Sequence, residues 1–146
     1  MNVTEIMAGS VQMLEPGEPL TSAARIMKEY DVGCVLVGCE GRVAGIVTDR
    51  DIVLRAVAGD NDIAELTLVE IMSRDPAFCS VDDTVLQAAR IMIDNQVRRL
   101  PVLDGDRAVA GIVSLGDICT HAPPNLAGEL IAEVSRPLHH ELAETL

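Results

Sequence analysis

The chain of 146 residues contains an internal repeat, and this feature constrains its fold more than any other. The five residues AARIM that begin at Ala23 recur 65 residues later at Ala88, and the five residues VAGIV that begin at Val43 recur at Val109. Repeats at such a spacing indicate structural units that cover each other's apolar faces. Because a chain of this length makes one ordinary domain, we expect two subdomains, with the function where they meet.

Each half predicts the same order of elements: strand, helix, strand, strand, helix. In the first half these are residues 11–14, 20–30, 34–37, 42–47 and 49–58. In the second half a strand with Phe78 and Cys79 precedes a helix over 84–95, strands over 100–103 and 108–113, and a helix over 115–121. The Asp104-Gly105-Asp106 run predicts a hairpin turn between those two strands. We divide the chain into a first repeat with its N-terminal segment and linker (1–65), a second repeat (66–122) and a tail (123–146).

The tail predicts one more helix. Leu126, Leu130, Ile131 and Val134 share a helical stripe before Pro137 interrupts it. Such a helix packs either on its own domain, on a second subunit or on a partner protein.

Composition and charge exclude several classes of partner. Hydrophobic residues make up 49% of the chain and aromatic residues 1%, so the core must be aliphatic. A net charge of −12 repels phosphate backbones and anionic lipids, so we expect neither nucleic acid nor a membrane as partner. Without a basic leader or a long apolar run, the chain is expected in the cytoplasm. The four cysteines show no C-x-x-C spacing and are expected as free, buried thiols, with no metal site.

A matching motif follows the last strand of each half. In each copy a glycine and two aliphatic residues are followed by a hydroxyl residue, and an aspartate comes three positions after that hydroxyl residue. The motif thus pairs Thr48 with Asp51 and Ser114 with Asp117. One interpretation is helix capping, in which the two side chains satisfy the first free backbone N–H groups. However, aspartate is shorter than the usual glutamate or glutamine, which leaves its carboxylate freer to accept hydrogen bonds from a ribose diol. The adjacent helix N-terminus offers amide donors to a phosphate.

With two copies of this motif and the run Val97-Arg98-Arg99-Leu100-Pro101-Val102, the chain resembles a tandem pair of CBS domains (a Bateman module) over residues 3–122. It is similar to small stand-alone prokaryotic CBS-pair proteins, some of which are associated with hypoxic or stress responses. The resemblance implies an α/β (α+β) fold of two pseudo-twofold-related β-α-β-β-α repeats that pack through their sheets and leave two clefts. Such modules commonly form homodimers.

The resemblance also implies that the clefts bind adenosyl compounds: AMP, ADP, ATP or S-adenosylmethionine. Thr48, Asp51, Ser114 and Asp117 would hold ribose. The aliphatic wall around adenine would comprise Ile46, Val47, Leu100, Pro101 and Ile112. By analogy, Thr48 and Asp51 face Arg98 and Arg99 with Arg50 close by, whereas Ser114 and Asp117 face the run from Gly33 to Leu36. We therefore expect phosphate in the Thr48/Asp51 cleft, where guanidinium groups would bind it. The alternative is that these arginines are solvated or paired with carboxylates.

No nucleophile and base are marked out, so we expect no enzymatic activity and no required cofactor. The leading hypothesis is a regulatory module in which an adenosyl ligand changes the packing of the halves or of a dimer, and a regulated protein reads that change. One competing hypothesis is an interaction module that docks through its tail. Another is a redox or metal sensor built on Cys34 and Cys39, with His121, His139 and His140 near the end of the chain.

Overall fold

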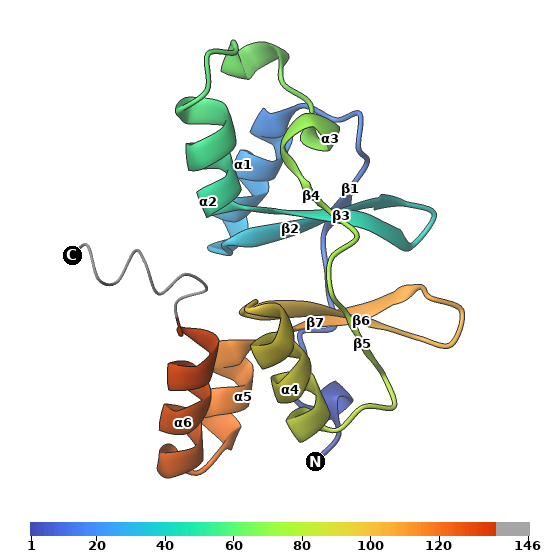
Figure 1. Ribbon diagram of the computed structural model, residues 1–146. Helices are drawn as coiled ribbons and strands as arrows, with labels where there is room; N and C mark the ends of the chain where they lie inside the picture. The colour runs from blue at the N-terminus through green and yellow to red at the C-terminus, as the bar shows by residue number, and fades with distance from the viewer. Residues whose placement is uncertain (137–146) are drawn as a thin grey trace, which may run out of the picture.

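The computed structural model describes residues 1–136, which form two similar halves (Figure 1). The first repeat comprises β1 (Met13–Leu14), α1 (Leu20–Tyr30), β2 (Cys34–Cys39), β3 (Arg42–Thr48), α2 (Asp49–Asp51) and the π-helical η2 (Ile52–Val57). The second comprises β5 (Cys79–Ser80), α4 (Val85–Asn95), β6 (Arg99–Leu103), β7 (Val109–Ser114) and α5 (Leu115–His121). The predicted α/β fold of two β-α-β-β-α repeats is confirmed.

Short helical or extended segments lead into the repeats. Before the first repeat lies the 3-10 turn η1 (Val3–Glu5). Between the repeats lie η3 (Ile63–Glu65), α3 (Leu68–Ile71) and β4 (Ser73–Arg74), and α6 (Pro124–Val134) follows the second repeat. We call residues 1–8 and 66–74 the first and second lead-in segments.

Each repeat contributes a small sheet to the middle of the molecule, with its helices on the outer side (Figure 1). In both sheets the first strand runs parallel to the second, which pairs antiparallel with the third: β1-β2-β3 in one and β5-β6-β7 in the other. The hairpin ends of the two sheets meet, because the N–H of Val109 donates to the carbonyl of Gly41 over 3.0 Å.

The long helices α1 and α4 occupy equivalent places because their apolar residues recur on one face. Ala23 of α1 and Ala88 of α4 are fully buried. Both helices end at a residue in the left-handed conformation, Asp31 with φ 52° and Gln96 with φ 52°. This sharp ending turns the chain directly into the central strand of each sheet.

The two lead-in segments are exchanged between the halves. Val3 of the first segment is fully buried in the core of the second repeat, with Met92 and Leu100. Leu68 of the second segment is fully buried in the core of the first repeat, with Leu20. The division at residue 65 therefore separates the sequence repeats, whereas each core draws on both sides of that division.

The motif glycines make this exchange possible. A Cβ on Gly111 would lie 2.6 Å from the carbonyl oxygen of Ala8 and 2.7 Å from the Sδ of Met7. A Cβ on Gly45 would lie 2.6 Å from the Sδ of Met72 and 2.9 Å from its Cγ. The close approach of each lead-in segment to a strand of the opposite repeat thus requires glycine at both positions.

Helix α6 packs on its own half, against α4 and α5. Leu130 and Val134 are buried there, whereas Leu126 and Ile131 remain exposed. Of the alternatives for the tail, packing on its own domain is confirmed for residues 124–134, while Pro137, His139 and His140 lie outside the described residues.

Two expectations were wrong. The single helix expected over 49–58 is a short α-helix followed by a π-helical segment. The cysteines are free, but only Cys79 is buried, whereas Cys34 and Cys119 are half-buried and Cys39 is exposed. Within residues 1–136 no helix is long and apolar enough to cross a membrane.

We expect Gly45→Ala and Gly111→Ala each to lower the free energy of unfolding by about 1–3 kcal/mol, because the added methyl group overpacks the contact with the lead-in segment. Gly17→Ala is the control, since a Cβ there meets nothing within 4 Å. Urea denaturation measures the difference. Equal stability of all three variants would contradict this account of the glycines.

Candidate functional site

A cleft of about 520 Å³ opens where the two repeats meet. Its walls combine segments that are far apart in the sequence: the chain from Ala8 to Gln12, the end of α1, the start of β2, and the end of β7 with the start of α5. The residues that line it include Cys34, Arg99, Ile112, Ser114 and Asp117. This volume lies within the range of small-ligand sites.

Ser114 and Asp117 form a reciprocal capping box at the start of α5. The N–H of Ser114 donates to Oδ2 of Asp117 over 2.8 Å, and the N–H of Asp117 donates to Oγ of Ser114 over 3.0 Å. The capping interpretation therefore holds for Oδ2 of Asp117. Within residues 1–136 the other oxygen, Oδ1, has no hydrogen-bond or ion-pair partner, so the carboxylate can cap the helix and still accept a bond in the cleft.

Thr48 and Asp51 form the same box at the start of α2, with distances of 2.9 and 3.1 Å. Here Oδ1 of Asp51 lies 3.8 Å from Nε of Arg55. Nη1 of Arg55 also donates to the carbonyl oxygens of Ile71 and Met72, which belong to the second lead-in segment. Asp51 is thus engaged by a neighbouring cation, whereas the position equivalent to Arg55 in the second repeat is His121.

Arg99 lies in the cleft opposite to the one expected. It lines the cavity with Ser114 and Asp117, and its Nη2 is 2.9 Å from the place where a Cβ on Gly33 would stand. The expectation that this cleft lacks all three candidate cations was therefore wrong. Burial raises the pKa of the Cys34 thiol, and the nearby Arg99 charge counteracts part of that rise.

Within residues 1–136, neither Arg98 nor Arg50 forms a hydrogen bond or an ion pair with Asp51. Nη2 of Arg98 donates to Oγ of Ser135, just beyond α6, over 2.8 Å. Arg50 is exposed in the first turn of α2. Arg98 precedes β6 and Arg99 begins it, and both also border a further cavity of about 410 Å³ beside Ser114.

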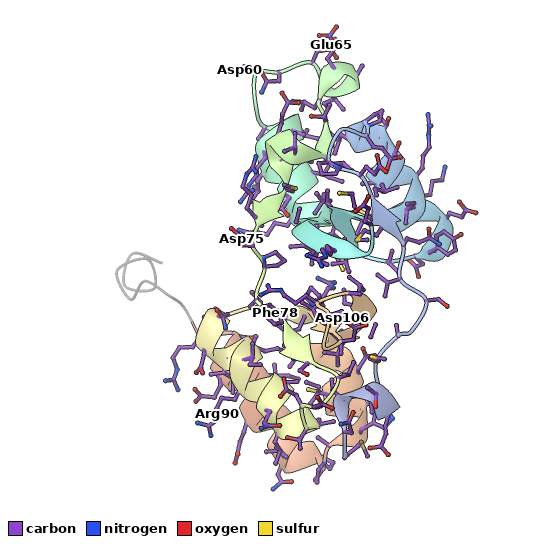
Figure 2. All side chains as sticks on the ribbon, turned by 90° about the vertical axis from the view of Figure 1, so that its right-hand side faces the viewer. Asp60, Glu65, Asp75, Phe78, Arg90 and Asp106 are labelled. Carbon is purple, nitrogen blue, oxygen red and sulfur yellow. The ribbon has the colours of Figure 1, made fainter. Side chains whose placement is uncertain are left out.

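Because side chains along a strand alternate between its two faces, some residues of the expected adenine wall point away from the clefts. Val47 and Leu100 are fully buried in the cores of their own repeats and cannot line a cleft. Ile112 lines the Ser114/Asp117 cleft. Pro101 lines a smaller cavity beside Phe78 and Arg107. Phe78 lies at the level where the halves meet (Figure 2). Ile46 is half-buried on β3.

Five further residues line the cleft that the sequence did not indicate. They come from the chain before β1 and from α1: Ser10, Val11, Gln12, Ile26 and Tyr30. Ser10, Val11, Gln12 and Tyr30 lie outside the repeated runs, whereas Ile26 belongs to the repeated run AARIM. The only available signal was their position before and within the first helix, and that signal does not tell which half they face.

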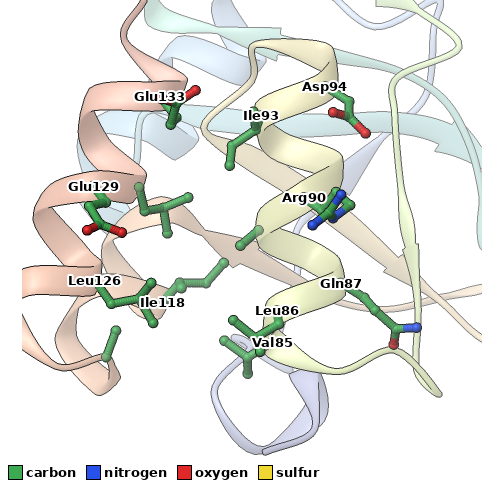
Figure 3. A pocket seen from close by; sticks show the side chains of 13 residues that line it. Val85, Leu86, Gln87, Arg90, Ile93, Asp94, Ile118, Leu126, Glu129 and Glu133 are labelled. Carbon is green, nitrogen blue, oxygen red and sulfur yellow. The ribbon is translucent and has the colours of Figure 1, made fainter.

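A second cavity, of about 490 Å³, lies between α4 and α6 (Figure 3). It is lined mainly by apolar side chains, among them Leu86, Ile93, Ile118 and Leu126. It contains neither motif aspartate, so it lacks the pairing of hydroxyl and carboxylate that the inter-repeat cleft offers. Within the described part of the chain, no group of three or more His, Cys, Asp or Glu side chains could hold a metal ion.

Comparison with known proteins finds two regions, residues 3–57 and 68–123, that match the CBS domain family. A CBS domain-containing protein of Bacillus subtilis, YhcV, is 33% identical over 144 residues, covering 95% of this chain and 99% of that protein. The structure of Hypoxic Response Protein I with two coordinated zinc ions is 33% identical, with a TM-score of 0.75, and covers 84% of this chain and 100% of that chain.

A third relative is a CBS domain pair solved with a ligand. The CBS domain pair of protein MJ0100, in complex with 5′-methylthioadenosine and S-adenosyl-L-methionine, is 27% identical, with a TM-score of 0.74. The match covers 82% of this chain and 98% of that chain. The repeated motif, the paired sheets and these matches together establish that the chain belongs to the CBS domain family and carries two CBS domains in tandem.

Proposed function

We propose that this chain is a non-catalytic regulatory module that binds an adenosyl ligand in the Ser114/Asp117 cleft. The observation that carries the proposal is the pairing, in one cavity, of an uncommitted carboxylate oxygen on Asp117 with the Arg99 guanidinium. The MJ0100 domain pair, solved with adenosyl compounds, supports the class of ligand. AMP, ADP, ATP and S-adenosylmethionine are the candidates, and no cofactor is required.

The chemistry of the cleft suits the parts of such a ligand. Oδ1 of Asp117 and the hydroxyl of Ser114 would hold the ribose diol. Ile112 would contact the adenine, and Arg99 would donate to a phosphate. Because the cleft joins the chain before β1 to the second repeat, occupancy would bias how the halves pack, and a homodimer or a regulated protein in the cytoplasm would read that bias.

The Thr48/Asp51 cleft stays a prediction as a second adenosyl site. Its candidate residues are Thr48 and Asp51 for ribose, Arg50 and Arg98 for phosphate, and Ile46 and Pro101 for the wall. Binding there would have to compete with Arg55 for Asp51 and with Ser135 for Arg98. We therefore place the stronger site in the opposite cleft.

An interaction module is the second candidate function. The cavity between α4 and α6, called a groove from here on, favours it (Figure 3). Leu86 of α4 and Leu126 of α6 border this groove, and both are exposed. A partner helix with an apolar face would bury them.

Asp117→Ala should weaken AMP binding about tenfold or more, because the ribose loses a charged acceptor. Asp51→Ala is the matched control: both variants lose an equivalent capping interaction at a cost of about 1 kcal/mol in stability. Isothermal titration calorimetry of both variants decides between the clefts. A loss confined to Asp51→Ala would place the main site at Thr48/Asp51, and the absence of adenosyl binding in the unmodified protein would favour the interaction module.

Cysteine reactivity tests the alternative of a thiol or metal sensor. Alkylation by iodoacetamide at pH 8 should modify the exposed Cys39 first and Cys79 last, because burial raises the pKa of Cys79 to about 11 and the thiolate is the reactive form. Cys34 should also lag behind Cys39, since burial raises its pKa. Mass spectrometry follows each site, and the unfolded protein is the control. Preferential modification of Cys34, or zinc that copurifies with the protein, would support a sensor.

A further inference from the structure

Gly33 is the place where the two repeats come nearest at the wall of the cleft. A Cβ on this residue would stand 2.9 Å from Nη2 of Arg99 and 3.3 Å from Oδ2 of Asp49. Gly33 is not among the residues with a positive φ, so its backbone conformation does not require glycine. The close contact comes from the end of the Arg99 side chain, which a side chain at position 33 would push aside.

Asp49 is held beside Gly33 by the backbone. Its N–H donates to the carbonyl oxygen of Gly33 over 3.0 Å. In the second repeat the equivalent bond joins Leu115 to the carbonyl of Arg98 over 2.8 Å, so a buried leucine replaces the carboxylate there. This charge is therefore present on only one side of the pseudo-twofold axis.

The guanidinium of Arg99 keeps its donors available. Among residues 1–136 it makes no hydrogen bond and no ion pair within 4.0 Å, although the Asp49 carboxylate approaches the same point. The Cys34 thiol responds to both charges, because Arg99 lowers its pKa and Asp49 raises it. Asp31 and Asp117 also line the cleft, so the Arg99 guanidinium lies in a cleft that has several carboxylates nearby.

We propose that Gly33 and Asp49 are positioning residues that decide how much negative charge a ligand in this cleft can carry. Gly33 leaves room for the Arg99 guanidinium, and Asp49 repels anionic groups beyond the first. The inference rests on the proposed adenosyl function and sharpens it. The cleft should prefer one anionic group on the 5′ carbon of adenosine over none and over a triphosphate.

The test is calorimetry with adenosine, AMP and ATP, without Mg²⁺. The unmodified protein should bind AMP about tenfold or more tightly than adenosine, the gain expected of a charged hydrogen bond. Gly33→Ala should lower this preference, because its methyl group shifts the guanidinium of Arg99. Gly17→Ala is the matched control, since a Cβ there meets nothing within 4 Å.

Asp49→Asn should raise the affinity for ATP relative to AMP, because it removes a like charge and keeps an acceptor for the N–H of Arg50. The same variant should speed alkylation of Cys34, since the pKa of that thiol falls when the Asp49 charge is lost. A merely structural role of Asp49 would not produce this change. If Gly33→Ala does not fold, Arg99→Met takes its place in the comparison of AMP with adenosine.

The outcomes separate the two proposals. Failure of adenosine and AMP to bind the unmodified protein overturns the adenosyl function itself. If adenosine binds but the AMP-to-adenosine ratio survives in Gly33→Ala or Arg99→Met, and the ATP-to-AMP ratio is unchanged in Asp49→Asn, the charge-selection inference is overturned and the adenosyl function stands.

Discussion

The contact of each lead-in segment with a glycine of the opposite repeat is the interaction on which the rest of the structure depends. Met7 and Ala8 lie against Gly111, and Met72 lies against Gly45. Through these contacts a segment from outside each repeat completes its core, with Val3 on one side and Leu68 on the other. The same contacts bring the chain that follows residue 8 to the mouth of the cleft, so the packing that stabilises the halves also builds the candidate site.

The long elements could be predicted from the sequence because their periodicity is strong. Helix α1 has the predicted bounds, Leu20–Tyr30, and the hairpin around Gly105 lies where the turn residues indicated. The lead-in segments could not be assigned to a half, because η1 has three residues and β4 has two, which is too short to show a period. The π-helical end of the first repeat also escaped prediction, since its apolar residues fit an α-helix equally well.

The candidate site was predictable in its motifs and less so in its geometry. The hydroxyl and carboxylate pairs lie at helix starts as expected, because the motif itself forms the cap. The side of Arg99 was wrong, since a long side chain near the pseudo-twofold axis can reach either cleft, and the absence of a side chain at Gly33 leaves room for it on this side. Val47 and Leu100 failed as cleft residues because alternation along a strand turns them toward the helices.

The exchanged lead-in segments also bear on how such a chain could have arisen. A polypeptide with a single repeat would lack the segment that fills its own core, and two copies could supply it to each other by swapping their N-terminal residues. The equivalent backbone bonds from Val85 to Met1 and from Leu20 to Leu66, 3.0 and 2.9 Å long, preserve this reciprocal arrangement within one molecule. Gene duplication and fusion would then have joined a swapped dimer covalently and freed its two copies to diverge, so that arginine now stands at position 99 and cysteine at the equivalent position 34.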